Sequence, residues 1–482
     1  MFICTQTPEF FNDLSESIRA FYPEVELKLA ECPSSDDDGI LHTMKLCDGC
    51  AVSTAVFMQH GMVKGEQTVR ISLETGDLAV KRGRKRSAKL SVFYLLREYT
   101  GRQLPWGSLT GIRPTRLIYE RKGAHKGEIE RELHDVFGVE TGKIKLLSRI
   151  IEVQAPFIQP AEDEVDIYIG IPFCATRCVY CSFATLDATK HFLIPQYMNA
   201  LLWEIKQTAR LLRDLGKGIR CLYIGGGTPT ALPETEFSQL MQACAEQFVP
   251  SLEFTVEAGR PDTISREKLL AARSAGVQRI SINPQTMNNQ TLELIGRHHS
   301  AEEIVACFTM AREIGFETIN ADLIAGLPGE NEEMFMQSLQ KVIALQPENI
   351  TVHTLSLKKG SRLAADETGF LMPPEGEVKA MVEGANAILQ QRDFLPYYLY
   401  RQKYQSGNLE NVGYAKKDHV GIYNIDMMEE TTSICALGAG AISKRVFGAE
   451  HRIERAPNCK SIYDYIARIE EMVERKKRLF TD

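Results

Sequence analysis

Between residues 165 and 356, short runs of β-branched and other apolar residues alternate with longer stretches in which apolar residues recur every three or four positions. The short runs predict buried strands, and the longer period predicts amphipathic helices that pack against them. The six predicted strands are Val165–Ile171, Arg220–Ile224, Glu253–Glu257, Gln278–Ile282, Thr318–Ile324 and Asn349–Thr354. Strands and helices that alternate in this way favour a parallel sheet, so we predict an α/β fold with a partial (β/α)6 barrel.

Each predicted strand leads directly into a cluster of glycine, proline or polar residues. After the first strand, these clusters are Gly225–Thr230, Glu257–Pro261, Asn283–Gln285, Ala325–Pro328 and Ser356–Gly360. In α/β barrels the active site is built from the loops that follow the carboxyl ends of the strands. We therefore expect these loops, together with the loop after the first strand, to surround one cavity.

The segments on either side of the barrel follow other patterns. Residues 1 to about 75 alternate in strand fashion around an Asp48–Gly49 turn, and residues 87–158 follow a helical pattern. We predict three parts, which are 1–160 (a small N-terminal α+β domain with a helical connector), 161–360 (the barrel) and 361–482 (a mixed C-terminal domain that covers the substrate). Cys47 and Cys50 flank the turn and could be half a zinc site or a redox pair. Without a second pair we favour a plain hairpin.

The most basic stretch of the chain is Arg82–Arg86, which lies between Lys81 and Lys89. A run of like charges is usually solvated, so we predict an exposed loop here. Guanidinium groups also pair bidentately with carboxylates and phosphates. The segment could therefore contact the carboxylates of a ligand or the phosphates of RNA.

Composition narrows the class of protein. The 482 residues are 44% hydrophobic and 25% charged, as in an ordinary globular protein, and no apolar run is long enough to span a membrane. The formal net charge of −7 argues against a protein whose main task is to coat nucleic acid. The N-terminal stretch does not resemble an export signal, so we expect a cytoplasmic protein. Its 12 cysteines should then be reduced thiols, available for metal or redox chemistry.

Three of these cysteines, Cys174, Cys178 and Cys181, lie on one short loop after the first predicted strand. A structural zinc site would need a fourth ligand, and no histidine or cysteine follows closely until His191. Three buried cysteines in a core loop are the simplest alternative. Three thiolates suit a 4Fe–4S cluster with one iron left open, because such a cluster normally takes four cysteines. We favour the cluster.

This Cys-x3-Cys-x2-Cys spacing, with Tyr180 before the last cysteine, resembles the radical S-adenosylmethionine (SAM) superfamily. Ile167–Phe173 and the later loops narrow the resemblance to the oxygen-independent coproporphyrinogen III oxidase group, and Leu109–Thr115 is similar to its HemZ branch. The resemblance implies a radical SAM barrel and a 4Fe–4S cluster whose open iron binds the amino and carboxylate groups of SAM. It also implies that an electron from the reduced cluster breaks the sulfonium of SAM and gives a 5′-deoxyadenosyl radical.

The loops after the strands offer residues that could bind SAM. Gly226, Gly227 and Thr228 allow a ligand to approach the backbone, because glycine lacks a Cβ, and they could equally form a tight barrel corner. Glu257 ends one predicted strand and Gln285 lies in the loop at the end of another, where a carboxylate or an amide can accept hydrogen bonds from ribose hydroxyls.

Two charged residues are further candidates. Arg297 follows Gln285 by twelve residues and could pair with a carboxylate of SAM or lie on a helix surface. Asp322 lies within an apolar strand, where an unpaired charge would be costly, so it needs a partner or a ligand. The resemblance implies that both contact SAM. It implies the same role for a further group of residues: Tyr168, Tyr180, Leu355 and Ile442.

The resemblance implies oxidative decarboxylation of two propionates of coproporphyrinogen III to give protoporphyrinogen IX, with electrons supplied by a donor such as flavodoxin or ferredoxin. Two positions depart from the oxidase subgroup, which has a histidine in place of Gly170 and a cysteine in place of Phe183. The sequence Cys181–Phe183 is more similar to that of haem-chaperone relatives. A haem-binding chaperone is therefore one alternative function, and a radical SAM enzyme that acts on RNA is the other.

Overall fold

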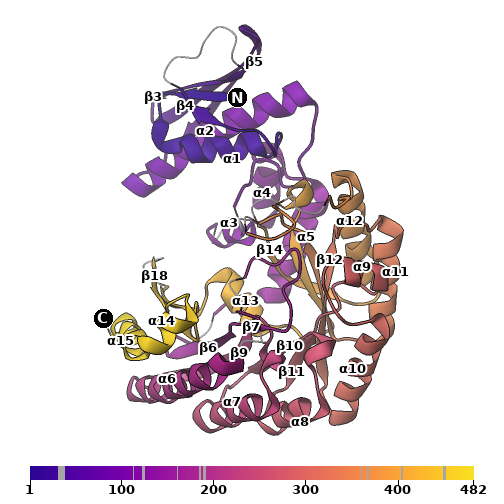
Figure 1. The fold of residues 1–482 in the computed structure, drawn as a ribbon. Helices are drawn as coiled ribbons and strands as arrows, with labels where there is room; N and C mark the ends of the chain where they lie inside the picture. Colours follow the sequence, from indigo (N-terminus) through magenta and orange to yellow (C-terminus); the bar gives the residue numbers. More distant parts are fainter. Residues whose placement is uncertain are drawn as a thin grey trace. The chain divides into compact units, whose positions relative to one another are not determined.

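A computed structural model describes residues 1–30, 38–111, 113–121, 125–159, 161–183, 186–187, 191–358, 360–365, 369–402, 405–448 and 452–481. Ile112 of the Leu109–Thr115 motif and Lys359 of the last loop cluster therefore lie outside the described residues. The chain divides into two compact units, Met1–Leu147 and Ser148–Asp482, which are called unit 1 and unit 2 below and are described separately (Figure 1). Within the described residues, no helix is long and apolar enough to cross a membrane.

The described residues of unit 1 form a five-stranded sheet with the order β2-β1-β3-β4-β5. The strands are β1 (Phe2–Thr5), β2 (Lys28–Leu29), β3 (Gly39–Cys47), β4 (Cys50–Gln59) and β5 (Met62–Ser72), and the longer helices are α1 (Phe11–Arg19) and α2 (Asp77–Thr100). Buried residues that alternate along β4, such as Ala55 and Phe57, pack with Val92 and Leu96 of α2 in one apolar core. Asp48 and Gly49 both have positive φ, and Cys47 pairs with Cys50 across them, which confirms the predicted hairpin.

The prediction of an exposed loop at Arg82–Arg86 is wrong. This segment lies inside the helix α2. The helix tolerates the run of like charges because acidic residues far away in the sequence face it. Arg84 pairs with Glu9 at 3.1 Å and Lys85 pairs with Asp13 at 3.1 Å. Unit 1 ends with short helices, α3 (Thr115–Tyr119), α4 (Lys126–Arg131) and a π-helical turn (Glu132–Val136), before α5 (Thr141–Gln154) leads into unit 2.

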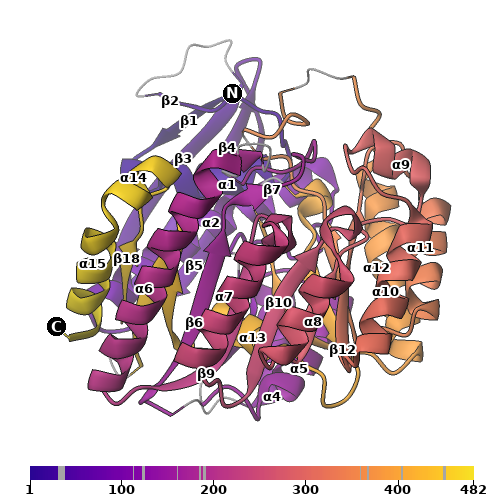
Figure 2. The ribbon, with the colours of Figure 1, turned by 60° about the horizontal axis from the view of Figure 1, so that its bottom comes forward.

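In unit 2 the described residues form an 11-stranded sheet. All six predicted strands are present and lie side by side, in chain order and parallel, as β6 (Glu164–Ile171), β9 (Gly218–Gly226), β10 (Glu253–Gly259), β11 (Arg279–Ile282), β12 (Thr318–Ala325) and β13 (Asn349–Thr354). Helices on the outer face connect them: α6 (Ile194–Asp214), α7 (Glu234–Gln247), α8 (Arg266–Ser274), α10 (Ala301–Ile314) and α11 (Glu332–Ala344). Figure 2 shows α6, α7 and α8 side by side in front of these strands.

The sheet continues beyond the six strands on both sides. Next to β13 it adds the antiparallel strands β15 (Asn411–Ala415) and β14 (Leu395–Tyr400), and helix α12 (Glu375–Gln391) precedes them in the chain. Next to β6 it adds the parallel strand β16 (Ser433–Leu437) and then β17 (Ile442–Phe447) and β18 (Arg452–Pro457). Among the described residues, the two edge strands β14 and β18 do not pair with each other, so the barrel is partial and open, as predicted.

The C-terminal helices α14 (Ile462–Ala467) and α15 (Ile469–Thr481) are tied to the barrel by a buried charge network. Lys476 of α15 donates to Glu204 of α6 at 2.5 Å, and both side chains are fully buried. The same carboxylate accepts hydrogen bonds from the Tyr465 hydroxyl and from the backbone N–H of Gly438. The turn at Gly438, which leads into β17, is therefore held on α6.

Candidate active site

The cysteine loop begins where β6 ends and is fastened to residues that follow three other strands of the sheet. Cys174 lies in the short strand β7 (Phe173–Cys174), Cys178 is buried, and Cys181 is half-buried. The backbone N–H of Thr228 donates to the Phe173 carbonyl at 2.8 Å, and its hydroxyl donates to the Cys174 sulfur at 3.6 Å. These contacts fix the first cysteine against the glycine loop after β9.

The other side of the cysteine loop rests on the helix α9 (Asn289–Leu294) and on residues after β13. The Val179 N–H donates to the Ile295 carbonyl at 3.1 Å, and the Thr176 hydroxyl donates to the Gly296 carbonyl at 3.1 Å. The guanidinium of Arg177 donates to the Gly360 carbonyl at 2.8 Å. The loop is therefore held by residues that follow β9, β11 and β13, as expected for loops that meet at one end of a barrel.

Gly226 explains why the loop after β9 is rich in glycine. Its φ is +106°, and a Cβ at this position would lie 2.9 Å from both the nitrogen and the oxygen of Ile171. The neighbouring Gly227 donates its N–H to the same Ile171 carbonyl at 2.7 Å. The tight-corner interpretation therefore accounts for Gly226. The loop also lies beside Cys174, so it stays a candidate for binding SAM.

Positive charge surrounds the three cysteines. Burial raises the pKa of the Cys181 thiol, the Cys178 and Cys174 sulfurs raise it further, and Arg177 lowers it. Burial lowers the pKa of Lys358, whereas the nearby Cys181 raises it.

Arg260, which is buried, also faces the Cys178 and Cys174 sulfurs and donates to Thr176 in the cysteine loop at 2.5 Å. Three thiols beside several cations fit a 4Fe–4S cluster with three cysteine ligands, since the cations offset the negative charge of thiolates.

Arg297 is only 5% exposed, so the alternative of a helix-surface arginine is wrong. Its Nη1 donates to the Tyr180 hydroxyl at 3.2 Å, and its Nη2 donates to the Asn283 carbonyl at 2.7 Å. Arg297 Nε and Asn283 Oδ1 are buried without a partner among the described residues. Because unpartnered buried polar atoms are costly, these two fit a polar ligand such as the amino-acid end of SAM. Sequence reasoning missed Asn283, although it stands in the Asn-Pro-Gln cluster that ends the strand.

Glu257 lies beside the glycine loop and accepts a hydrogen bond from a tyrosine that the sequence did not single out. The Tyr223 hydroxyl donates to Glu257 Oε1 at 2.6 Å. Burial raises the pKa of Glu257 to about 7. Tyr223 also begins an aromatic stack, with ring centroids 4.5 Å from Tyr423 and 6.4 Å from Tyr168. Tyr168 is thus brought to the interior of the sheet next to Glu257.

Asp322 has the partner that its place in an apolar strand demanded. Its carboxylate lies 3.6 Å from His353 Nε2 and accepts a hydrogen bond from the Asn320 amide at 2.8 Å. Burial alone would raise the pKa of Asp322, but the hydrogen bonds of His353 and Asn320 hold it below its usual value. Tyr400 lies next to His353, with its hydroxyl 3.3 Å from Nδ1. Sequence reasoning missed His353 and Tyr400, because only the register between strands brings them to Asp322.

The remaining candidates lie in different surroundings. Gln285 has a φ of +68° and is bonded to β12, since its N–H donates to the Asp322 carbonyl at 2.8 Å. Leu355 is buried in an apolar cluster that includes Val179 of the cysteine loop. Ile442 begins β17, two strands beyond β6, and is 49% exposed. The structure therefore brings Gln285 and Leu355 to the cysteine end of the strands, whereas Ile442 lies partly exposed at the start of β17.

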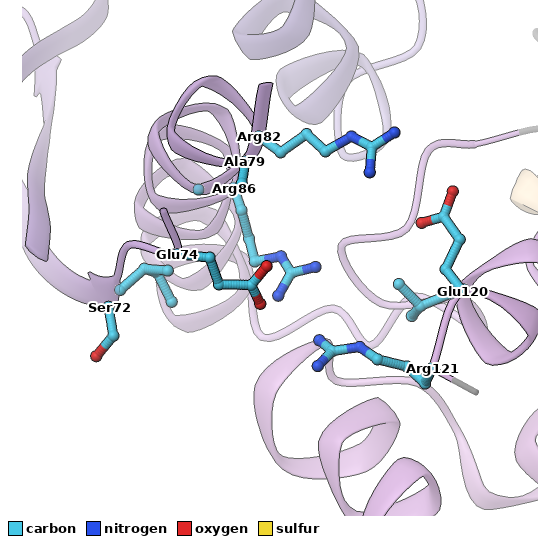
Figure 3. A pocket seen from close by; sticks show the side chains of 10 residues that line it. Ser72, Glu74, Ala79, Arg82, Arg86, Glu120 and Arg121 are labelled. Carbon is cyan, nitrogen blue, oxygen red and sulfur yellow. The ribbon is translucent and has the colours of Figure 1, made fainter. Parts of the chain in front are cut away.

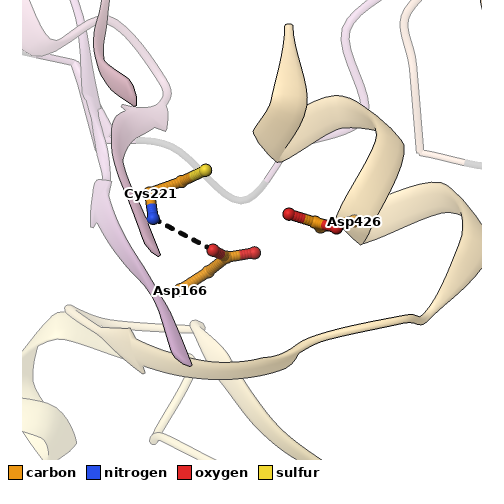
Figure 4. Close-up of side chains that lie close together, drawn as sticks. All are labelled: Asp166, Cys221 and Asp426. Atoms are coloured by element: carbon orange, nitrogen blue, oxygen red, sulfur yellow. Dashed lines mark hydrogen bonds between the residues drawn. The ribbon is translucent and has the colours of Figure 1, made fainter. Parts of the chain in front are cut away.

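A second acidic cluster, made of Asp166, Cys221 and Asp426 of the helix α13 (Ile422–Glu429), lies deeper along β6 and β9 (Figure 4). Asp166 accepts a hydrogen bond from the Cys221 N–H at 3.1 Å, and Asp426 accepts one from Arg220 at 2.8 Å. Burial, and then the charge of Asp426, raise the pKa of Asp166 well above its usual value. Residues near the amino end of barrel strands serve stability, so we assign this cluster to the core.

Comparison with known proteins agrees with this geometry. A family model described as the radical SAM superfamily, whose members use a 4Fe–4S cluster and SAM, matches residues 168–342. The solved structure titled coproporphyrinogen III oxidase (HemN) from Escherichia coli, a radical SAM enzyme, is 24% identical with a TM-score of 0.50, over 67% of this chain and 72% of that one, which shows a shared fold.

Two curated proteins of Bacillus subtilis are more similar in sequence. The heme chaperone HemW is 38% identical over 39% of this chain and 49% of its own length. The oxygen-independent coproporphyrinogen-III oxidase-like protein HemZ is 39% identical over 391 residues, which are 79% of this chain and 78% of that protein. The chain therefore belongs to the radical SAM family of oxygen-independent coproporphyrinogen III oxidase-like proteins, in its HemZ-like branch.

Proposed function

We propose that this chain decarboxylates two propionates of coproporphyrinogen III oxidatively to vinyl groups, without oxygen, and so yields protoporphyrinogen IX. The observation that carries the proposal is the convergence of the cysteine loop, Arg297, Glu257 and the Asp322–His353 pair at one end of the parallel strands. The similarity of this chain to the B. subtilis protein that is named as oxidase-like supports the same reaction.

We propose that Cys174, Cys178 and Cys181 are the ligands of the cluster. Arg297 would pair with the carboxylate of SAM, and Glu257 and Gln285 would accept hydrogen bonds from its ribose. When bound, the cluster and SAM supply a carbon-centred radical that removes one hydrogen atom from the β-carbon of a propionate.

The other residues of the site position SAM and keep water away from it. Gly226, Gly227 and Thr228 allow close approach to the backbone, and Leu355 and Ile442 would contact the adenine side as apolar surfaces. The pair Asp322–His353 would accept and donate hydrogen bonds at the polar end of SAM, since the carboxylate is kept ionised by its partners. Tyr168 and Tyr180 would close the site with their rings.

The electron balance of the reaction shows that it needs an electron acceptor and an electron donor. Each propionate loses one hydrogen atom, its carboxyl carbon as CO2 and one further electron, while a C=C bond forms. The single electron needs a one-electron acceptor, and the reduced cluster needs a donor, for which we propose a flavodoxin or a ferredoxin. We propose that residues 361–482 cover the substrate, with Tyr398 and Tyr400, which stack at 6.3 Å, as one wall.

The two departures from the oxidase subgroup have a structural context. A Cβ at Gly170 would lie 3.2 Å from the Tyr168 ring, so this ring covers the place of a side chain at position 170. Phe183 is 61% exposed beside Cys181. The similarity to the HemW chaperone makes haem binding the second candidate function.

The test is an anaerobic incubation of the reconstituted protein with coproporphyrinogen III, SAM and a reductant, followed by chromatography of the oxidised porphyrins. The proposal expects a product with two vinyl groups that is absent from the Cys178→Ala variant. A protein that binds haem tightly and yields no vinyl product would instead be a chaperone. Cleavage of SAM that depends on RNA and ignores tetrapyrroles would contradict both functions.

A further inference from the structure

Unit 1 contains a pocket that the proposed reaction does not use. It encloses about 170 Å³ and is called the arginine pocket here, because Arg82, Arg86 and Arg121 line it together with Glu74, Glu120 and Leu117. Figure 3 shows Arg82 and Arg86 extending from α2, and Glu120 and Arg121 extending from the opposite side toward the same space. The basic segment noted in the sequence thus contributes two of the three arginines.

Helix geometry divides that basic segment between two faces. Arg84 and Lys85 turn toward acidic residues of the N-terminal helices and form ion pairs there. Arg82 and Arg86, four positions apart, share the other face of α2 and line the pocket. Among the described residues Arg82 forms no ion pair, and it is exposed to solvent. Its charge is therefore available to a ligand.

The other two arginines of the pocket are held in place by one carboxylate. Glu132 accepts from Arg86 at 3.4 Å and from Arg121 at 2.5 Å. Burial lowers the pKa of Arg86, so its guanidinium has lost part of its hydration. An anion that restores hydrogen bonds to Arg86 would offset this cost, and the shared partner Glu132 fixes the geometry in advance.

The charges around the pocket leave an excess of positive charge. Glu120 is engaged by Arg116, at 3.0 Å, outside the pocket. Among the described residues, the charged side chains that line the pocket are three arginines and two glutamates, a difference of one positive charge: Arg82, Arg86 and Arg121 against Glu74 and Glu120. The ligand should therefore be a small anion.

We propose that the arginine pocket binds the phosphate group of a small metabolite. Guanidinium forks match the oxygens of phosphate bidentately, which a single lysine cannot do. A volume of about 170 Å³ equals roughly six water molecules at about 30 Å³ each. This space admits a phosphate with a few attached atoms. The site lies within unit 1 and does not depend on the proposed decarboxylation.

Calorimetric titration of the full-length protein with inorganic phosphate tests the proposal. We expect saturable binding with one site per chain, weakened at least tenfold in Arg82→Gln. The matched control is Arg84→Gln, which removes the same charge from the same helix but outside the pocket, and which should bind phosphate within twofold of the wild type. Thermal unfolding of Arg82→Gln should match that of the wild type, because Arg82 forms no ion pair among the described residues, whereas Arg84→Gln loses its pair with Glu9.

Titrations with other ligands identify the source of the phosphate and show whether the proposed site is wrong. Tighter binding of glycerol 3-phosphate than of inorganic phosphate assigns an organic ester, and equal affinities assign the free ion; both support the site. The proposal is overturned by the absence of saturable binding, by equal weakening in Arg84→Gln, or by tighter binding of succinate. A single-stranded RNA bound through Arg84 as much as Arg82 would make the segment a nucleic-acid surface and would also overturn it.

Discussion

Arg297 donates a hydrogen bond from Nη1 to the hydroxyl of Tyr180 at 3.2 Å, and so joins the end of α9 to the cysteine loop. Tyr180 stands directly before Cys181, so this bond places a buried guanidinium beside the three sulfurs. The unpartnered Nε of Arg297 is the part of that guanidinium left for a ligand. The same residue can therefore position the loop and bind SAM, and these two roles can be separated by experiment.

Replacing Arg297 with Ala should weaken SAM binding and leave the iron content unchanged, because the side chain is not a cluster ligand. Loss of a charged hydrogen bond costs about 1.5–3 kcal/mol, which is roughly ten- to a hundredfold in affinity. Equilibrium dialysis with labelled SAM measures the change. Arg266→Ala, which removes an exposed arginine paired with Glu313, is the control and should bind SAM normally. Unchanged affinity in Arg297→Ala would remove this residue from the site.

The cysteine assignment makes a separate prediction about iron. The protein reconstituted under anaerobic conditions should carry about four irons, and Cys178→Ala should lose them together with the brown colour, since three cysteinates leave no spare ligand. Iron analysis and the visible spectrum measure this. Cys47→Ala is the control, because Cys47 lies on the hairpin of unit 1. Loss of iron in Cys47→Ala with full iron in Cys178→Ala would contradict the assignment.

The barrel could be predicted from the sequence because its signals are local. Each strand is a short apolar run that ends in glycine or polar residues, and the three cysteines share one loop. His353 and Tyr223 could not be predicted, because their roles depend on which strands become neighbours. The run of like charges around Arg84 predicts a loop, because the partner Glu9 that makes a helix possible lies 75 positions away in the chain.

The glycine loop makes a prediction about stability. Gly226→Ala should lower the unfolding free energy by about 2–5 kcal/mol, since a left-handed φ costs about 1–2 kcal/mol and the clash of the added Cβ with Ile171 costs about 1–3 kcal/mol more. Gly216→Ala separates the two effects, because Gly216 has a φ of +64° and no described atom within 4 Å of its Cβ site. Urea unfolding of both variants should show a clearly larger loss for Gly226→Ala. Equal losses would mean that the contact with Ile171 relaxes freely.

The buried pair Asp166 and Asp426 predicts a dependence on pH. Because the pKa of Asp166 is raised in the folded protein, its contribution to stability is complete below the ordinary pKa and is lost as the pH rises through the raised value. Asp166→Asn stays neutral, so it should match the wild type at about pH 3.5, below the ordinary pKa, and be the more stable of the two near pH 8. Urea midpoints at both pH values measure this, with the exposed Asp163→Asn as control. A variant that is less stable at pH 8 would contradict the shifted carboxyl.

The most direct test of the proposed function is the ratio of three products in one anaerobic reaction: CO2, 5′-deoxyadenosine and vinyl groups. Decarboxylation initiated by one hydrogen abstraction per propionate predicts a ratio of about one to one to one, two of each for every coproporphyrinogen III consumed, and none of the three in Cys178→Ala. Formation of 5′-deoxyadenosine by the wild-type protein without CO2 or vinyl product would contradict the account.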